Sequence, residues 1–176
     1  ITTELNLKTL VALLTSEVLP SLLIRQSALI EINDGAVNII YVQNVDTRQL
    51  PGYNDLPVLL AGAGRYYSHG EDGSLPLGWA YLTLALSVEQ KPIGIWLLGR
   101  HDPDDYYSPQ EIKILQSLAH QTAIALANIS QAGQLRTLYQ RDIDQREVER
   151  ASLARDLHDQ VLNELAVLKD RLDDGA

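Results

Sequence analysis

The feature that most constrains this chain is a long uninterrupted helical pattern in its C-terminal part. Ser108, Pro109 and Glu111 form an S-x-x-E capping box with proline at the first helical position. No proline follows, and Gly133 is the one weak point before the final residues. The sequence therefore predicts one helix on the order of 60 residues and 90 Å long, at ~1.5 Å per residue.

The apolar residues of this helix follow a heptad-like pattern that shifts phase once. The first seam is Ile112, Leu115, Ala119, Thr122, Leu126 and Ile129. Leu135, Tyr139 and Ile143 then step by four, as at a coiled-coil stutter. A compact domain of this size cannot by itself bury the apolar residues of so long a helix. We therefore expect a homodimer that pairs through the C-terminal helix.

The N-terminal half predicts a helix, a hairpin and a loop-rich excursion. Residues 4–19 carry leucines and valines at helical spacing, and Pro20 ends that pattern. Two β-rich runs within 26–45 meet at Asp34-Gly35, which suits a two-residue turn. Residues 46–78 are dense in Gly, Pro and Asp. Only 55–64 predicts a short helix there, started by Asn54 or Asp55.

Two further strands precede the long helix. Residues 79–88 and 93–99 are rich in large apolar side chains and are joined by a polar turn. Strands of this composition are typical of the centre of a sheet. The predicted fold class is thus α+β, an antiparallel sheet with packed helices followed by a long C-terminal helix.

Composition excludes several classes of protein. Hydrophobic residues make up 45% and charged residues 21%, as in a soluble globular protein. The net charge of −9 repels phosphate backbones, so we expect no nucleic-acid partner. There is no cysteine, which excludes disulfides, thiolate metal sites and thioether-linked chromophores and fits a cytoplasmic location. No run is long enough for a membrane span, so we expect no membrane contact.

Residues 79–128 resemble the C-terminal half of a GAF domain. The resemblance rests on the strand "IGIWLLG" and the helix "YSPQEIKILQSLAHQTAIALANIS". It implies a GAF sensor domain over 1–130, with helices on one face of the sheet and a ligand pocket roofed by loops on the other. Bilin attachment is excluded without cysteine, and the cyclic-nucleotide signature is absent, since the chain lacks phenylalanine.

The ligand of such a domain is left open by the sequence. Haem would need an axial histidine, for which His69 in the loop-rich excursion is a better candidate than His101 or His120. The pocket candidates are Arg65, Tyr67, His69 and Trp79; core or rim packing is the alternative for Trp79 and the tyrosine. We expect no metal site and no resident cofactor in this part of the protein.

A second resemblance lies in "ERASLARDLHDQVLNELAVL", residues 149–168. It is similar to the phosphoacceptor helix of sensor histidine kinases whose partners are NarL-type response regulators. That implies a signalling-helix linker over 131–148 and a truncated first helix of the dimerisation domain over 149–176. Because the chain also lacks methionine, we interpret it as a piece of a longer parent. The matching positions are Glu149, Arg150, Ala154, Arg155, Asp156, Leu157, His158 and Asp159.

The second resemblance assigns roles to three residues. His158 would be the phosphoacceptor, on the flank of an apolar stripe, and Asp159 would orient its ring. An ion pair with Arg155 is an alternative role for Asp159. Asn163 stands where the family commonly has a glutamine that positions water for a phosphatase reaction. Without the resemblance, a lone histidine such as His158 is most simply a solvated polar residue. The apolar stripe is Ala154, Leu157, Val161, Leu165, Leu168 and Leu172.

The favoured hypothesis is a GAF input domain that controls autophosphorylation of His158 and phosphotransfer to a response regulator. ATP and Mg²⁺ would bind to the parent's ATP-binding domain, because no phosphate-cradling motif occurs in this chain, which would be inactive alone. The alternative is a GAF-type dimerisation scaffold without ligand or phosphotransfer. A soluble enzyme is disfavoured, since no convergent catalytic set is evident.

Overall fold

The computed structural model describes residues 2–33, 36–66, 77–103 and 106–173, with side chains described from 6 to 165 within those ranges. Contacts divide the chain into two units, Ile1–Gln131 and Ala132–Ala176. Each unit is considered by itself. Asp34 and Gly35, the predicted turn, lie outside the described residues.

The first unit begins with the predicted N-terminal helix. It consists of α1 (Thr2–Leu13), a π-helical turn η1 (Leu14–Val18) and α2 (Leu19–Ser21). Pro20 lies in the last of these, and the helix ends one residue later, at Ser21. The predicted end of this helix is therefore confirmed within two residues.

Four antiparallel strands form one sheet in the order β2-β1-β4-β3. The strands are β1 (Ser27–Asn33), β2 (Ala36–Gln43), β3 (Leu82–Val88) and β4 (Lys91–Leu98). Asn33 pairs with Ala36, so the hairpin has the two-residue connection that the sequence predicts. The expectation that both later strands are central holds only for β4, since β3 lies at the edge of this four-strand order. Strand β3 is apolar because both of its faces are covered.

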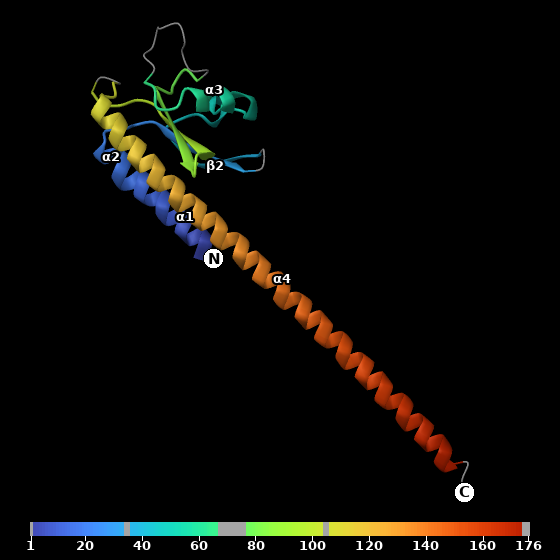
Figure 1. Cartoon of the computed structure of the whole chain (residues 1–176). Coiled ribbons are helices and arrows are strands. Elements are labelled where there is room, and N and C mark those ends of the chain that lie inside the picture. Colours follow the sequence, from blue (N-terminus) through green and yellow to red (C-terminus); the bar gives the residue numbers. More distant parts are fainter. Residues whose placement is uncertain (1, 34–35, 67–76, 104–105, 174–176) are drawn as a thin grey trace. The chain divides into compact units, whose positions relative to one another are not determined.

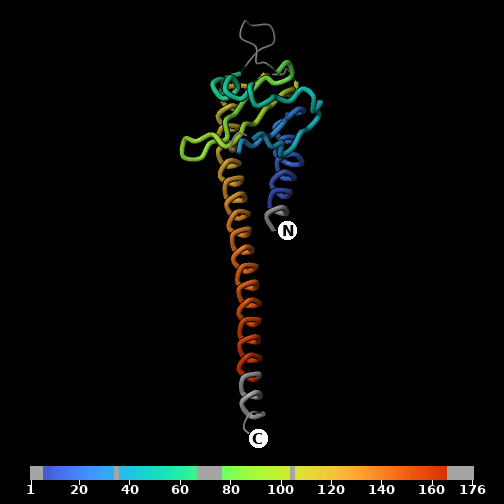
Figure 2. Tube along the Cα trace, turned by 90° about the vertical axis from the view of Figure 1, so that its right-hand side faces the viewer, coloured from blue at the N-terminus to red at the C-terminus, as the bar shows by residue number. Residues whose placement is uncertain are grey.

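The two faces of the sheet carry separate hydrophobic clusters. On one face, Leu29, Leu84 and Trp96 pack in one cluster with residues of α1 and of the first part of α4 (Pro109–Asp173). On the other face, Ile30 and Ile95 pack with the short helix α3 (Leu56–Ala61). Figures 1 and 2 show α1 and the first part of α4 on one side of the sheet and α3 on the other. The unit is thus a three-layer α+β structure.

Two 3₁₀ turns link β2 to α3. They are η2 (Thr47–Gln49) and η3 (Tyr53–Asp55). The predicted N-cap role of Asp55 takes a different form, because its carboxylate accepts a 2.8 Å hydrogen bond from the Gly52 amide and makes no cap bond to α3. The acid therefore closes the turn that precedes the helix.

Helix α4 begins as predicted and continues through Gly133 to Asp173. The Glu111 amide donates to Ser108 Oγ at 3.3 Å, and the Ser108 amide donates to the Glu111 carboxylate at 2.8 Å. These two bonds confirm the capping box. No described helix, α4 included, combines the length and apolarity needed to cross a bilayer.

The first seam of α4 is occupied within its own unit. Leu115, Ala119, Thr122 and Leu126 are buried, and all but the threonine belong to the cluster beneath β1 and β4. The prediction that this seam pairs with a second helix is therefore wrong for residues 115–126. The heptad pattern there arises because the helix packs along a sheet, which uses the same apolar stripe.

The capping box gives a first prediction. Ser108→Ala should lower the free energy of unfolding by about 1 kcal/mol, because it removes the N-cap oxygen. Ser108 is also the main cause of a depressed pKa at Glu111, below its ordinary value of 4.5. A depressed carboxyl pKa stabilises the fold above the unfolded pKa and loses that contribution as pH falls through the folded pKa. The difference in free energy of unfolding between the variant and wild type should thus narrow at acid pH, leaving the contribution of the pH-independent bond from the Glu111 amide to Ser108 Oγ. Exposed Ser117→Ala is the matched control; an equal loss there would contradict the capping role.

Candidate functional site

The second unit is the distal part of α4, and its apolar side chains face solvent. Each is more than half exposed, although side chains at helical spacing of this kind normally pack against a neighbour. Within the described side chains, this face is thus a surface that no part of the same unit covers. Its residues are Leu135, Leu138, Tyr139, Ile143, Leu153, Leu157, Val161 and Leu165, whereas the exposed Val148 and Leu162 lie on other sides of the helix.

His158 lies beside this face with its ring open to solvent. Its side chain is 71% exposed, and Nδ1 lies 3.5 Å from Asp159 Oδ1. That separation is longer than a good hydrogen bond but short enough for a carboxylate to favour a proton on Nδ1. A proton held on Nδ1 leaves Nε2 with its lone pair, which is the form of imidazole that acts as a nucleophile. The carboxylate therefore lies on the Nδ1 side of a ring that is open to solvent.

The neighbours of this pair follow from helical spacing. Among the described residues, Asp159 has its ion-pair contact with His158 and none with Arg155, the alternative partner considered from the sequence. Asn163 lies one turn after Asp159, so both side chains belong to the same strip of the helix. Asn163 is exposed. An amide is thereby available near Asp159.

Two of the four predicted pocket residues, Arg65 and Trp79, are among the described residues. Trp79 is buried in the cluster beneath α3, and its Nε1 donates a 3.0 Å hydrogen bond to the Gln49 carbonyl. Arg65 is exposed, and Tyr67 and His69 lie outside the described residues. Trp79 therefore has a packing role, whatever else it does.

A surface groove of about 480 Å³ adjoins Trp79. Its charged groups already have partners nearby, since Arg48 lies 2.6 Å from Asp46 and holds the pKa of that carboxyl below its usual value. Behind the groove, apolar side chains of β1 and β4 fill the sheet face. The described part of this region thus offers a shallow polar groove. Its lining is Arg48, Gln49, Leu50, Asp55, Leu77, Gly78 and Trp79.

A buried polar trio lies on the opposite face of the sheet and was not evident from the sequence. Trp96 Nε1 donates to Ser27 Oγ and to Tyr41 Oη, both at 2.8 Å, and the two oxygens are 2.9 Å apart. Burial raises the pKa of Tyr41 to about 12. The tyrosine therefore stays neutral, and the trio satisfies buried polar groups in the core.

His101 connects the end of β4 to the start of α4. It is buried, with Nε2 3.4 Å from Glu111 Oε1 and its ring 4.9 Å from that of Tyr107. Tyr107 in turn donates a 2.9 Å hydrogen bond to the Gly99 carbonyl. His120, the other described haem candidate, is exposed on α4. These contacts give His101 a structural role at the helix start.

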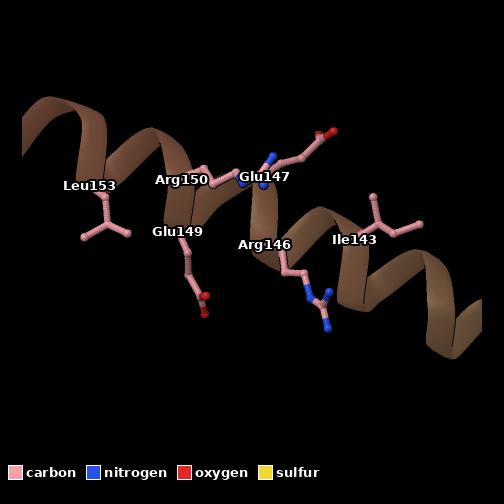
Figure 3. A pocket seen from close by; sticks show the side chains of 6 residues that line it. All are labelled: Ile143, Arg146, Glu147, Glu149, Arg150 and Leu153. Carbon is pink, nitrogen blue, oxygen red and sulfur yellow. The ribbon is translucent and has the colours of Figure 1, made fainter.

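The distal part of α4 carries a second polar feature that the sequence did not single out. A hollow of about 430 Å³ lies along one side of the helix. Figure 3 shows the side chains that line it, with Ile143 at one end and Leu153 at the other. Between these apolar residues lie Arg146 and Arg150, with Glu147 and Glu149 projecting from opposite edges. Continuing the heptad count beyond Ile143 would have revealed two arginines at seam positions.

Comparison with known proteins places the fold in a class. No protein-family model and no curated protein matches the chain. A solved structure of the GAF domain/HD domain protein from Geobacter sulfurreducens matches with a TM-score of 0.54 at 13% identity, covering 70% of this chain and 94% of that one. At this identity the likeness shows the fold alone. The chain therefore has a GAF-like α+β fold followed by a long C-terminal helix.

Proposed function

We propose that this chain is the sensory part of a two-component histidine kinase, with the GAF-like unit as input and His158 as phosphoacceptor. The observation that carries the proposal is the exposed His158 ring with Nδ1 against Asp159 at 3.5 Å. The sequence around it, "ARDLHDQ", resembles the phosphoacceptor motif of kinases that act on NarL-type response regulators. Geometry and motif support the same reactive atom.

The proposed reaction uses the contact between His158 and Asp159. Nε2 of His158 attacks the γ-phosphorus of ATP bound to a kinase ATP-binding domain with Mg²⁺; a P–N bond forms and the P–O bond to ADP breaks. The ring becomes positively charged during attack, and the Asp159 carboxylate beside Nδ1 stabilises that charge. An aspartate of the response regulator then takes the phosphoryl group from Nε2. In a separate hydrolytic reaction, the Asn163 amide would position water that attacks the regulator's phosphoaspartate and releases inorganic phosphate.

The proposal includes a homodimer through the distal part of α4. Its apolar face is more than half exposed along its described length, and helices with such a face pair to bury it. His158 lies on the flank of the stripe rather than at its centre. Pairing would thus bury Leu157 and Val161 and leave the imidazole accessible. We place this module in the cytoplasm, where ATP and a response regulator are present.

The alternative is a dimerisation scaffold without phosphotransfer. It is favoured by one observation, the apolar filling of the sheet face beneath α3, where a GAF ligand would otherwise bind. A scaffold needs the exposed stripe of α4 but makes no use of His158. Phosphate transfer to the chain therefore separates the two functions.

The test is phosphotransfer in trans. The chain is mixed with a separately produced ATP-binding domain of this kinase class, γ-labelled ATP and Mg²⁺. Label that survives alkali but is lost in acid, as expected for phosphohistidine, supports the kinase function. If the chain stays unlabelled although the ATP-binding domain is shown to bind ATP, the kinase function is contradicted and the dimerisation scaffold is supported.

Asp159→Asn tests the orienting carboxylate. An amide cannot stabilise the positive ring, so the initial rate of labelling should fall by about 100-fold while the helix remains intact. Asp156→Asn is the matched control, because Asp156 is an exposed acid two residues before the histidine. Equal rates for the two variants would show that general negative charge, rather than the Asp159 contact, supports the reaction.

A further inference from the structure

The hollow in Figure 3 interrupts the apolar face of α4 with charge. Tyr139, Ile143, Arg146, Arg150, Leu153 and Leu157 succeed one another at alternating steps of four and three residues, which is the spacing of a coiled-coil seam. Two of these six seam positions are arginines. Glu147 follows the first arginine and Glu149 precedes the second, so the acids flank the seam on its two edges.

In the single chain these four side chains are solvated. Arg146 is 73% exposed and lies 3.1 Å from Asp142, one turn earlier. Glu149 accepts a 3.0 Å hydrogen bond from Gln145, also one turn earlier. Neither contact buries the charge. A partner helix would therefore meet two arginines and two glutamates that are free to rearrange.

We propose that Arg146, Glu147, Glu149 and Arg150 form a self-complementary charged layer that fixes the register of two α4 helices and selects a second copy of this chain as the partner. This layer presupposes the homodimer proposed above. A coiled-coil seam has two alternating types of position. In a parallel, in-register pair, the residue that follows a seam position of one type contacts that same position on the opposite helix, and so does the residue that precedes a seam position of the other type. Glu149 would thus face the partner's Arg150, and Glu147 the partner's Arg146.

In this arrangement each arginine of the layer meets a glutamate of the partner helix. Each chain brings two arginines and two glutamates, so the layer of a homodimer sums to zero. Guanidinium groups suit such pairs because their planar donors match a carboxylate. A slip of seven residues sets one chain's Arg146 and Arg150 opposite Leu153 and Leu157 of its partner, and the partner's arginines opposite Tyr139 and Ile143. Arg146 then faces Ala154 or Gln140 in place of Glu147 and loses its counter-charge, which is costly, whereas Arg150 still faces an acid, Asp156 or Asp142.

The charged layer also disfavours pairing of α4 with helices of other proteins. A partner with an ordinary apolar seam would offer neither arginine a counter-charge, and a partner with basic flanks would repel both. The apolar residues on either side supply affinity for any amphipathic helix, whereas the charged layer discriminates among such helices. The device resembles a buried polar residue at a coiled-coil seam, which lowers stability but specifies register.

The chain has no cysteine, so engineered cysteines report register without background. Leu157→Cys forms a disulfide with its own copy in the in-register pair. A mixture of Leu157→Cys and Glu164→Cys chains forms the mixed disulfide only after a seven-residue slip. In the wild-type background we expect the in-register product to exceed the slipped one by about tenfold. In Arg146→Leu/Arg150→Leu both products should be comparable; unchanged selectivity would overturn the proposal.

Charge reversal tests partner choice. Arg146→Glu/Arg150→Glu makes the layer acidic, and Glu147→Arg/Glu149→Arg makes it basic. With Leu157→Cys in each, we expect about tenfold less self-cross-linking for either variant alone and recovery when the two are mixed. Circular dichroism checks that both remain helical. Wild-type-like self-pairing by both variants, or no recovery on mixing, would overturn the layer. No cross-link of Leu157→Cys in an otherwise wild-type chain would overturn the homodimer as well, whereas labelling of His158 is measured independently of either.

Discussion

Replacing His158 with alanine is expected to abolish acid-labile labelling of the chain, with a loss of more than about 100-fold, because it removes the nucleophilic atom itself. The side chain is 71% exposed, so the substitution leaves no buried cavity and the fold should be unaffected. The measurement is the initial rate of label transfer from γ-labelled ATP through a separate ATP-binding domain. Matching circular dichroism spectra establish that the variant is folded.

His120→Ala is the matched control for this result. His120 is also exposed and also on α4, but it has no motif around it. Its variant should label at the wild-type rate. Labelling that persists in His158→Ala, or that falls equally in both variants, would contradict the assignment of His158.

Gly94→Ala is expected to lower the free energy of unfolding by about 2–3 kcal/mol, because the new methyl group cannot fit. A Cβ at Gly94 would lie 2.5 Å from the backbone oxygen of Ile30 and 3.1 Å from Leu86 Cδ1. Gly94 is in β4, which pairs with β1 and β3, so neither strand can retreat without breaking the sheet. Thermal unfolding should show a melting temperature lower by about 5–10 °C.

Gly78→Ala separates this clash from a general effect of replacing glycine. Among the described residues, no atom beyond the two chain neighbours lies within 4 Å of the position that a Cβ at Gly78 would occupy. That variant should stay within about 0.5 kcal/mol of wild type. Equal losses at both positions would mean that the close approach of β4 to β1 does not explain the glycine in "IGIW".

Much of the structure of the first unit can be predicted from local sequence patterns. The capping box at Ser108 and Glu111, the two-residue connection between β1 and β2 and the helix that ends near Pro20 all depend on residues close in sequence. The use of the first α4 seam is different. The spacing of Leu115, Ala119 and Leu126 is the same whether the helix packs on a sheet or on another helix, so the sequence alone could not assign its partner.

The side-chain arrangements show the same division. The position of His158 on the flank of a stripe follows from helical periodicity, whereas its contact with Asp159 depends on rotamers that the sequence does not specify. The trio of Ser27, Tyr41 and Trp96 requires the register of three strands, which is set by sheet assembly. The candidate ligand residues of the loop-rich excursion remain predictions.

The chain's two tryptophans lie in different layers of the first unit. Trp96 is completely buried beside the helices, with its indole N–H held by Ser27 and Tyr41, whereas Trp79 packs beneath α3 and borders the surface groove. Trp96→Phe and Trp79→Phe each leave one emitter. Each face of the sheet thus has one intrinsic fluorophore. Emission from Trp79 in the Trp96→Phe variant reports on the α3 face, and emission from Trp96 in the Trp79→Phe variant reports on the face covered by α1 and α4, when a metabolite is added or the protein is unfolded.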